Sequence, residues 1–180
     1  MFRIFFLFFL IICPIKALAL IEVDITRGNL NPLPIAVSPL SIDEKSKESF
    51  KKILNKDNIG LEISSVVEKN LKTSGLFNPL NKDAFLQAPD IANLKPRFED
   101  WNLIKAQALI TGKVNFDNDK LRVEFRLWDV LAGKEMMALA FTTVPSNWRR
   151  VGHIITDKVY ERLTGEKGYF DTRIIYVAEE

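Results

Sequence analysis

The chain has 180 residues, of which 25 are Lys or Arg and 23 are Asp or Glu, so its formal charge is +2. This length suits one compact domain, and the near balance of charge argues against nucleic-acid binding through bulk basicity. A single cysteine excludes a disulfide framework and a Cys-rich zinc site. A single histidine excludes multi-His metal sites and leaves little room for a catalytic triad.

Residues 1–19 have the pattern of a secretory signal peptide. Arg3 gives a positive start, residues 4–12 form an unbroken apolar run, and Ala17-Leu18-Ala19 supplies the small residues of a cleavage site. The run is shorter than the roughly 20 apolar residues that span a bilayer, so an uncleaved anchor is the weaker alternative. We expect an exported chain that starts at Leu20, contains no cysteine and inserts no segment into the membrane. Removal of Arg3 and Lys16 leaves its basic residues equal in number to its 23 acidic residues.

The first part of the exported chain alternates strand and helix patterns. Residues 21–26 alternate apolar and polar, which predicts a strand with one buried face. Residues 35–37 are apolar and lie between prolines, which predicts a short central strand. Residues 41–57 are polar and Lys-rich, which favours a surface loop with one short helix. Residues 59–74 carry apolar side chains at helical spacing and are followed by Gly75, so they predict a helix with a glycine at its end.

The middle of the chain predicts an antiparallel meander. Residues 78–96 hold three prolines and favour an irregular connection, and residues 98–105 favour a short helix. Three strands follow at residues 108–116, 121–128 and 136–144, and the second alternates apolar residues with charged ones.

A helix and a last strand complete the pattern. The helix begins after Ser146, its expected N-cap, and ends at Gly165, and residues 172–178 predict the final strand. The order of elements predicts an α/β fold: a two-layer domain with helices packed on one face of a mixed, mainly antiparallel sheet of about five strands.

The sequence offers no catalytic motif, and we expect no enzyme, no cofactor and no metal site. Residues 164–168 are glycine-rich but follow a helix, whereas phosphate binds at a helix N-terminus. His153 falls on the polar face of its helix, which favours a surface or interface role over that of a general base. Asp117 and Asp119 fit a hairpin turn better than a calcium loop. The lysines between residues 45 and 56 alternate with acidic residues and predict a solvated face.

Two binding hypotheses remain open at this point. The 21–26 strand can pair with its own sheet or with the sheet edge of a partner, with Ile21, Val23 and Ile25 on one face and Glu22 and Asp24 on the other. The alternative is a small-ligand or glycan site on the sheet face around Trp128, which shares its side of the strand with Arg122 and Arg126.

Several segments resemble the N-terminal domain of the TolB family. Residues 160–177, preceded by His153 and Asp157, resemble the end of that domain, and this is the most specific match. Residues 21–26 followed by residues 34–37 resemble its mature start. Weaker matches are Asp100-Trp101 before residues 108–112, and the strand at residues 125–130.

The resemblance implies a periplasmic, non-enzymatic role in the Tol–Pal system, which supports outer-membrane integrity, cell division and protein import. In that family the mature N-terminal segment binds the C-terminal domain of TolA, and a following six-bladed β-propeller binds Pal. Carried onto this sequence, the TolA-binding residues are Leu20, Ile21, Glu22, Val23, Asp24, Ile25, Thr26, Arg27 and Gly28. We expect Pal binding only if a propeller follows, and we expect no nucleic-acid partner.

The expected organisation has four parts. Residues 1–19 are the signal peptide, residues 20–33 a mobile N-terminal strand and hinge, and residues 34–171 the TolB N-terminal-like α/β domain. Residues 172–180 are expected to begin a C-terminal β-propeller that this chain does not contain.

Overall fold

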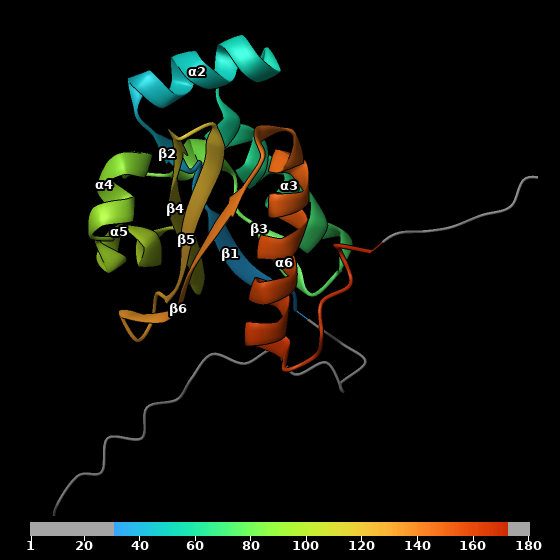
Figure 1. Cartoon of the computed structure of the whole chain (residues 1–180). Coiled ribbons are helices and arrows are strands. Elements are labelled where there is room, and N and C mark those ends of the chain that lie inside the picture. Colours follow the sequence, from blue (N-terminus) through green and yellow to red (C-terminus); the bar gives the residue numbers. More distant parts are fainter. Residues whose placement is uncertain (1–30, 173–180) are drawn as a thin grey trace, which may run out of the picture.

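A computed structural model describes residues 31–172, which form a mixed sheet with helices on both sides (Figure 1). The sheet has six strands in the order β3-β1-β4-β5-β6, with β2 pairing with β4 beyond the end of β1. The strands are β1 (Leu33–Val37), β2 (Ser41–Ile42), β3 (Phe77–Pro79), β4 (Ala108–Asp117), β5 (Lys120–Asp129) and β6 (Lys134–Thr143).

Parallel and antiparallel pairs occupy different parts of this sheet. β1 runs parallel to β3 and to β4, and β2 also runs parallel to β4. β4, β5 and β6 form the expected antiparallel meander, with Val114 opposite Val123 and Phe125 opposite Leu139. The predicted fold class, an α/β two-layer domain with a mixed sheet, is confirmed, with one strand more than the five expected.

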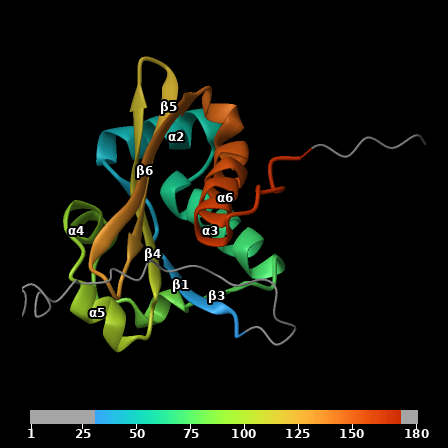
Figure 2. The same cartoon turned by 90° about the horizontal axis from the view of Figure 1, so that it is seen from below.

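The main helical layer is formed by two helices, α3 (Ile59–Thr73) and α6 (Trp148–Thr164), which lie side by side on one face of the sheet (Figures 1 and 2). Their apolar stripes join the inward residues of the strands in a single core, whose largest fully buried side chains include Phe50, Ile63, Phe125 and Ile155. The predicted helix at residues 59–74 is confirmed: Asn58 caps it, and Gly75 follows with φ +74°.

The other face of the sheet is also covered, so the prediction of helices on one face only and a solvated second face was wrong. Two short helices, α4 (Pro89–Leu94) and α5 (Phe98–Leu103), lie on that side (Figure 2). They enclose a second, smaller core around Trp101 and Leu109. The Nε1 of Trp101 donates a hydrogen bond to Oε1 of Gln87 at 2.8 Å, so a buried polar contact holds the two segments together.

Of three local predictions, the first holds only for its helix and the other two were wrong. The region at residues 41–57 is mostly helical, with β2 followed by α2 (Glu44–Leu54), because the Asp43 carboxylate caps the helix and Phe50 packs edge-on against Phe116 at 5.3 Å. The irregular connection at residues 78–96 contains β3, the short 3₁₀ helix η1 (Lys82–Ala84) and α4. Ser146 is not the N-cap of α6, because a 3₁₀ turn, η2 (Pro145–Asn147), comes first and moves the cap to Asn147.

Other local predictions hold. The strand at residues 121–128 alternates as expected, with Leu121, Val123, Phe125 and Leu127 buried. Asn118 and Asp119 form the hairpin turn, and both have positive φ, as a tight two-residue hairpin requires. Gly165 ends α6 with φ +76°, and its N–H donates to the carbonyl of Glu161. The strands predicted at residues 21–26 and 172–178 lie, wholly or almost wholly, outside the described residues.

No helix among residues 31–172 combines the length and the apolar character needed to cross a membrane.

Candidate functional site

The predicted partner-binding residues, Leu20 to Gly28, lie outside the described part of the chain, but the strand into which they lead is described. β1 begins at Leu33, which is buried, and continues through Ile35, which is fully buried. The segment therefore joins the domain at an interior strand of the sheet.

Main-chain hydrogen bonds hold the start of β1 on both sides. The N–H of Leu33 donates to the carbonyl of Leu76 at 2.9 Å, and the N–H of Gln107 donates to the carbonyl of Pro34 at 2.9 Å. The N–H of Leu80 donates to the carbonyl of Ile35 at 2.9 Å. Because β1 is paired along both edges, the chain enters the domain at a fixed point, in an interior strand next to the edge strand β3.

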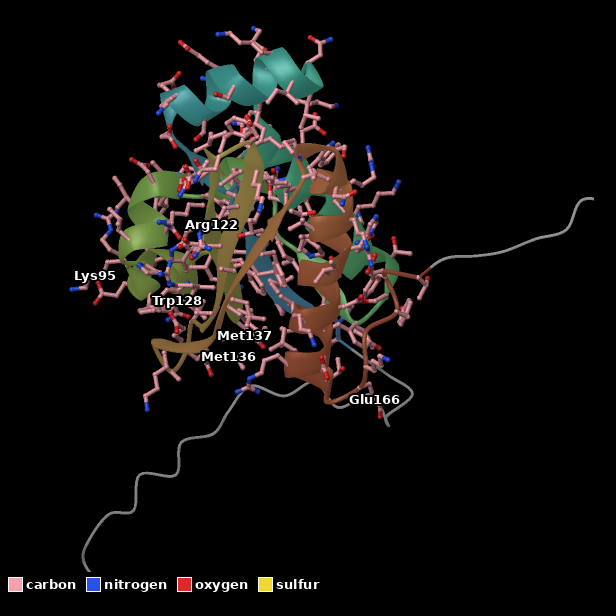
Figure 3. All side chains as sticks on the ribbon, viewed as in Figure 1. Lys95, Arg122, Trp128, Met136, Met137 and Glu166 are labelled. Atoms are coloured by element: carbon pink, nitrogen blue, oxygen red, sulfur yellow. The ribbon has the colours of Figure 1, made fainter. Side chains whose placement is uncertain are left out.

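The second candidate site, around Trp128, is largely occupied by the protein itself. The Nε1 of Trp128 donates to Oγ1 of Thr111 at 2.9 Å, and its ring meets Phe98 edge-on at a centroid distance of 5.8 Å. The Nε1 edge of the Trp128 ring therefore contacts β4, and part of the ring contacts α5. Figure 3 shows Trp128 and Arg122 at different heights along β5.

The two arginines on this sheet face are also paired. Arg126 forms an ion pair with Glu135 at 3.3 Å and donates to Oδ1 of Asn93, and Arg122 pairs with Glu124 at 3.0 Å. The carboxyl of Glu124 has a pKa below its ordinary value: burial works against the charged form, but hydrogen bonds and charge from Arg122 and Lys113 outweigh it. A hollow of about 210 Å³ lies between these side chains and β6, whose Ala138 and Ala140 also line it.

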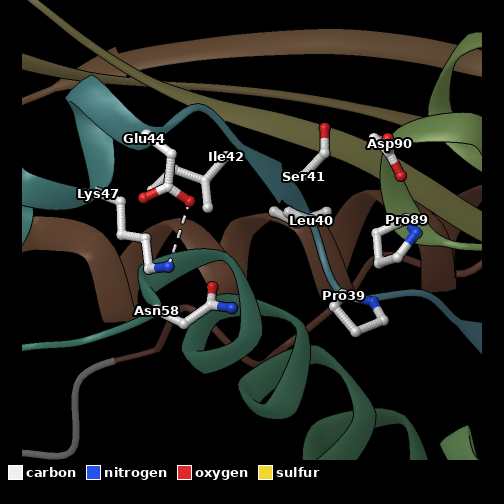
Figure 4. Close-up of a pocket in the computed structure, with 9 residues that line it drawn as sticks. All are labelled: Pro39, Leu40, Ser41, Ile42, Glu44, Lys47, Asn58, Pro89 and Asp90. Atoms are coloured by element: carbon white, nitrogen blue, oxygen red, sulfur yellow. Dashed lines mark hydrogen bonds and ion pairs between the residues drawn. The ribbon is translucent and has the colours of Figure 1, made fainter.

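A larger hollow of about 320 Å³ lies where three helices begin (Figure 4). Its lining comes from β2, from the first turns of α2 and α4 and from the cap of α3. Its polar groups already serve the fold. The Ser41 hydroxyl donates to the carbonyl of Gly112, Oδ1 of Asn58 accepts from the N–H of Leu61, and Lys47 pairs with Glu44 at 3.3 Å.

His153 and the acidic turn take structural positions. Nδ1 of His153 lies 2.8 Å from Nδ2 of Asn70, which also donates to Oγ1 of Thr156 at 3.2 Å, so the histidine belongs to the interface between α3 and α6. Asp117 and Asp119 flank the β4–β5 turn. Within residues 31–172, no group of three or more His, Cys, Asp or Glu side chains could hold a metal ion.

One structural feature was missed by sequence reasoning: the chain after α6 is hydrogen-bonded back to that helix. The Asp157 carboxylate accepts the backbone N–H groups of Phe170 and Asp171 at 2.7 and 3.0 Å. Asp171 in turn forms a bidentate ion pair with the guanidinium of Arg150. Gly168 passes so close that a Cβ there would lie 2.4 Å from Cα of Asp157. The loop at residues 165–172 is therefore held in one direction as it leaves the domain.

Known proteins resemble this chain in sequence and in fold. It is 83% identical over 178 residues to the Tol-Pal system protein TolB of Pelagibacter ubique (strain HTCC1062), an alignment that covers 99% of this chain and 40% of that protein. This chain therefore spans well under half of the length of its relative. The structure of TolB from Acinetobacter baumannii superposes with a TM-score of 0.63 at 22% identity, over 84% of this chain and 33% of that one, which supports the fold.

The match to a known family covers most of the sheet. Residues 21–136 match the family described as the TolB amino-terminal domain, a range that runs from the predicted partner-binding segment to the start of β6. The chain belongs to the TolB amino-terminal domain family.

Proposed function

We propose that this chain is the N-terminal part of a periplasmic, non-enzymatic adaptor of the Tol–Pal envelope system. Its residues 20–28 bind the C-terminal domain of TolA by adding a strand to the sheet edge of that partner. Membership of the family and 83% identity to a Tol-Pal system protein support the assignment to the Tol–Pal system. The alternation of residues 21–26 supports binding by strand addition.

The observation that carries this proposal is the position of β1. A strand that adds to a partner links the two proteins only if it is firmly attached to its own domain. The start of β1 meets this requirement because it is hydrogen-bonded along both edges and Leu33 is buried. The predicted hinge begins at Gly28, the last residue of the binding segment, and leads to this anchor. Leu33, which the sequence placed in the strand-and-hinge part at residues 20–33, belongs to the sheet.

The organisation of the whole protein is part of the same proposal. Residues 1–19 direct export and are removed, residues 20–32 form the binding arm, and the α/β domain extends to about residue 171. Residues 172–180 lead into a propeller that binds Pal. The fastened loop at residues 165–172 would set the direction in which that propeller begins. Through TolA and Pal the adaptor would support outer-membrane integrity, constriction at cell division and protein import.

Deletion of residues 20–28 is the first test. The chain without residues 1–19 retains every described contact, and so does the same chain without residues 1–28. We expect isothermal titration calorimetry to show binding of the TolA C-terminal domain to the former and none to the latter, with identical circular dichroism spectra. Undiminished binding after the deletion would refute the role of the segment.

A point substitution separates main-chain pairing from simple apolar contact. Consecutive N–H groups of a strand point to opposite edges, so one of Val23→Pro and Asp24→Pro removes an N–H that faces the partner. We expect that variant to lower TolA affinity by at least about tenfold, and more than the other proline variant does, since proline is tolerated in a strand only where its missing N–H would face solvent. Val23→Ile preserves the N–H and the strand propensity, so it should bind nearly as the wild type does. Equal affinities for both proline variants and Val23→Ile would show that the segment does not bind as a strand.

A further inference from the structure

Helix α2 covers the outer edge of β4 near the turn between β4 and β5 (Figure 1). β1 and β2 pair with this edge as far as Val114. The next outward N–H, that of Phe116, donates instead to Oγ of Ser46 on α2, at 2.9 Å. A helix side chain therefore replaces a strand at this point, and covering an edge with a helix is one way in which proteins keep it from pairing with other chains.

The apolar contacts that hold α2 in place are few for a helix of this length. Six of its eleven residues are charged, and only Ser46 and Phe50 are buried. Phe50 packs edge-on against Phe116 at a centroid distance of 5.3 Å, and Leu54 is half-buried against the core. Most helices in proteins are stabilised by a packed apolar face. In α2 that face consists of one aromatic ring and part of one leucine.

One hydroxyl joins the start of α2 to the sheet. The Asp43 carboxylate accepts the N–H of Ser46 at 2.9 Å and the hydroxyl of Ser46 at 2.7 Å. The same hydroxyl oxygen accepts the N–H of Phe116. Because hydrogen bonds in a chain polarise one another, the cap of the helix and the cover of the β4 edge strengthen each other, and the loss of one weakens both.

The two ends of α2 are positions at which the chain changes direction. The helix starts after Asp43, which is extended, and ends at Asn55, which has φ +52°. A left-handed conformation costs free energy in any residue other than glycine, so this end is held against local strain. The ion pair across it, from Lys51 to Asp57 at 2.8 Å, joins two largely exposed side chains and stabilises it little.

We propose that α2 is a hinged cover, which lifts from β4 as a unit about Asp43 and Asn55 while α3, α6 and the rest of the sheet stay folded. Its lifting uncovers the β4 edge at residues 115–117. Openings of this kind occur in elements with few buried apolar contacts. The cover goes beyond the proposed function and is separate from it, because β1 begins beside Ala108, at the opposite end of β4.

Native-state hydrogen exchange at increasing urea concentration, followed by nuclear magnetic resonance on the chain without residues 1–19, tests the proposal. We expect the amides of residues 47–54 and of Phe116 to exchange through one common opening. That opening should depend only weakly on urea, because it exposes little surface. The amides of β5 should exchange through global unfolding, with a steep dependence on urea.

Two substitutions at opposite ends of α2 test whether the helix opens as a unit. Ser46→Ala removes the shared hydroxyl and should speed the exchange of residues 47–54 and of Phe116 by about tenfold, the effect of one lost hydrogen bond. Asn55→Ala increases the strain at the other end of the helix and should speed the same amides several-fold. Neither variant should change the exchange of the β5 amides.

Ser49→Ala is the matched control, because this hydroxyl donates to the carbonyl of Lys45 within α2, at 3.0 Å. It should not speed the exchange of Phe116. Three results would overturn the proposal. One is a wild-type Phe116 amide that exchanges in step with the β5 amides. Another is a Ser46→Ala variant in which the Phe116 amide alone exchanges faster. The third is a faster exchange in Asn55→Ala that does not reach Phe116.

Discussion

The contact between α3 and α6 depends on Gly152, and replacing it gives a prediction with a calculable size. Gly152 lies in the interior of α6, where a Cβ would be 2.8 Å from Cγ1 and 2.9 Å from Cβ of Val66 on α3. Ordinary contacts of this kind begin near 3.4 Å, so Gly152→Ala must push the two helices apart or distort the valine. Val66 is β-branched and stiff in a helix, so rotation of its side chain does not relieve the clash.

Two opposing effects set the magnitude. Overpacking a well-packed core costs about 1–3 kcal/mol, whereas Ala favours the helix over Gly by about 1 kcal/mol. With a neighbour that cannot rotate away, we expect the upper half of the first range, so Gly152→Ala should lower the free energy of unfolding by about 1–2 kcal/mol. The melting temperature should fall by about 2–4 °C for each kcal/mol.

Urea denaturation followed by circular dichroism measures this loss, and a double-mutant cycle identifies its cause. Val66→Ala removes the atoms that the new methyl group meets, so Gly152→Ala should cost about 1–2 kcal/mol less in that background. Gly165→Ala is the control: it has no atom within 4 Å of its Cβ position but a φ of +76°, so it should destabilise through backbone strain and show no coupling to Val66. A Gly152→Ala variant as stable as the wild type, with no coupling to Val66→Ala, would refute the described helix contact.

Three further outcomes follow from individual contacts. The pKa of Asp43 is lowered, first by the hydrogen bond from the backbone N–H of Ser46 and then by that from its hydroxyl. Its stabilising contribution is therefore present above pH 3.8 and is lost as pH falls through the folded-state pKa. Asp43→Asn retains the cap but should remove this part of the acid dependence, as urea titrations between pH 2 and 5 on both proteins would show; an unchanged pH profile would contradict it. Burial, and then the charges of Tyr169 and Glu166, raise the pKa of Tyr160 above 10, so ultraviolet titration should show a late-ionising phenol that Tyr160→Phe removes; a retained phase would contradict the assignment. Trp128→Ala should leave TolA binding unchanged in calorimetry while lowering stability by about 1–3 kcal/mol, since the ring is half-buried; a loss of binding in the folded variant would favour the sheet-face site instead.

The parts of the fold that could be predicted from the sequence are those in which one long element repeats a single pattern. β5 alternates over its whole length, and α3 and α6 each carry an apolar stripe over four turns or more, so their periodicity outweighs local propensity.

The parts that could not be predicted depend on contacts made at long range. β3 has three residues, one of them Pro79, and is a strand only because β1 pairs with it. α2 has a strongly charged sequence, and its formation depends on Asp43 at its cap and on Ser46, whose hydroxyl accepts the N–H of Phe116 on β4. The two short helices on the second face have a proline at or just before their start and carry too few residues for a periodic signal.

The candidate site also has one part that could be predicted from the sequence and one that could not. The alternation of residues 21–26 predicts a strand that pairs with something, but no pattern within six residues identifies the partner, and the resemblance to the TolB family supplied it. The anchoring of β1 between two parallel strands could not be foreseen, because Leu76 and Gln107, which fix its start, are distant in sequence.

Hydrogen exchange of the amides of residues 21–26, with and without the TolA C-terminal domain, tests the central claim most directly. If the segment adds as a strand, alternate amides of these residues become protected on binding and lose that protection in whichever of Val23→Pro and Asp24→Pro removes a partner-facing N–H, while the amides of β1 stay protected throughout. Saturating TolA binding with the amides of residues 21–26 still exchanging at the rate of an open chain would contradict the account.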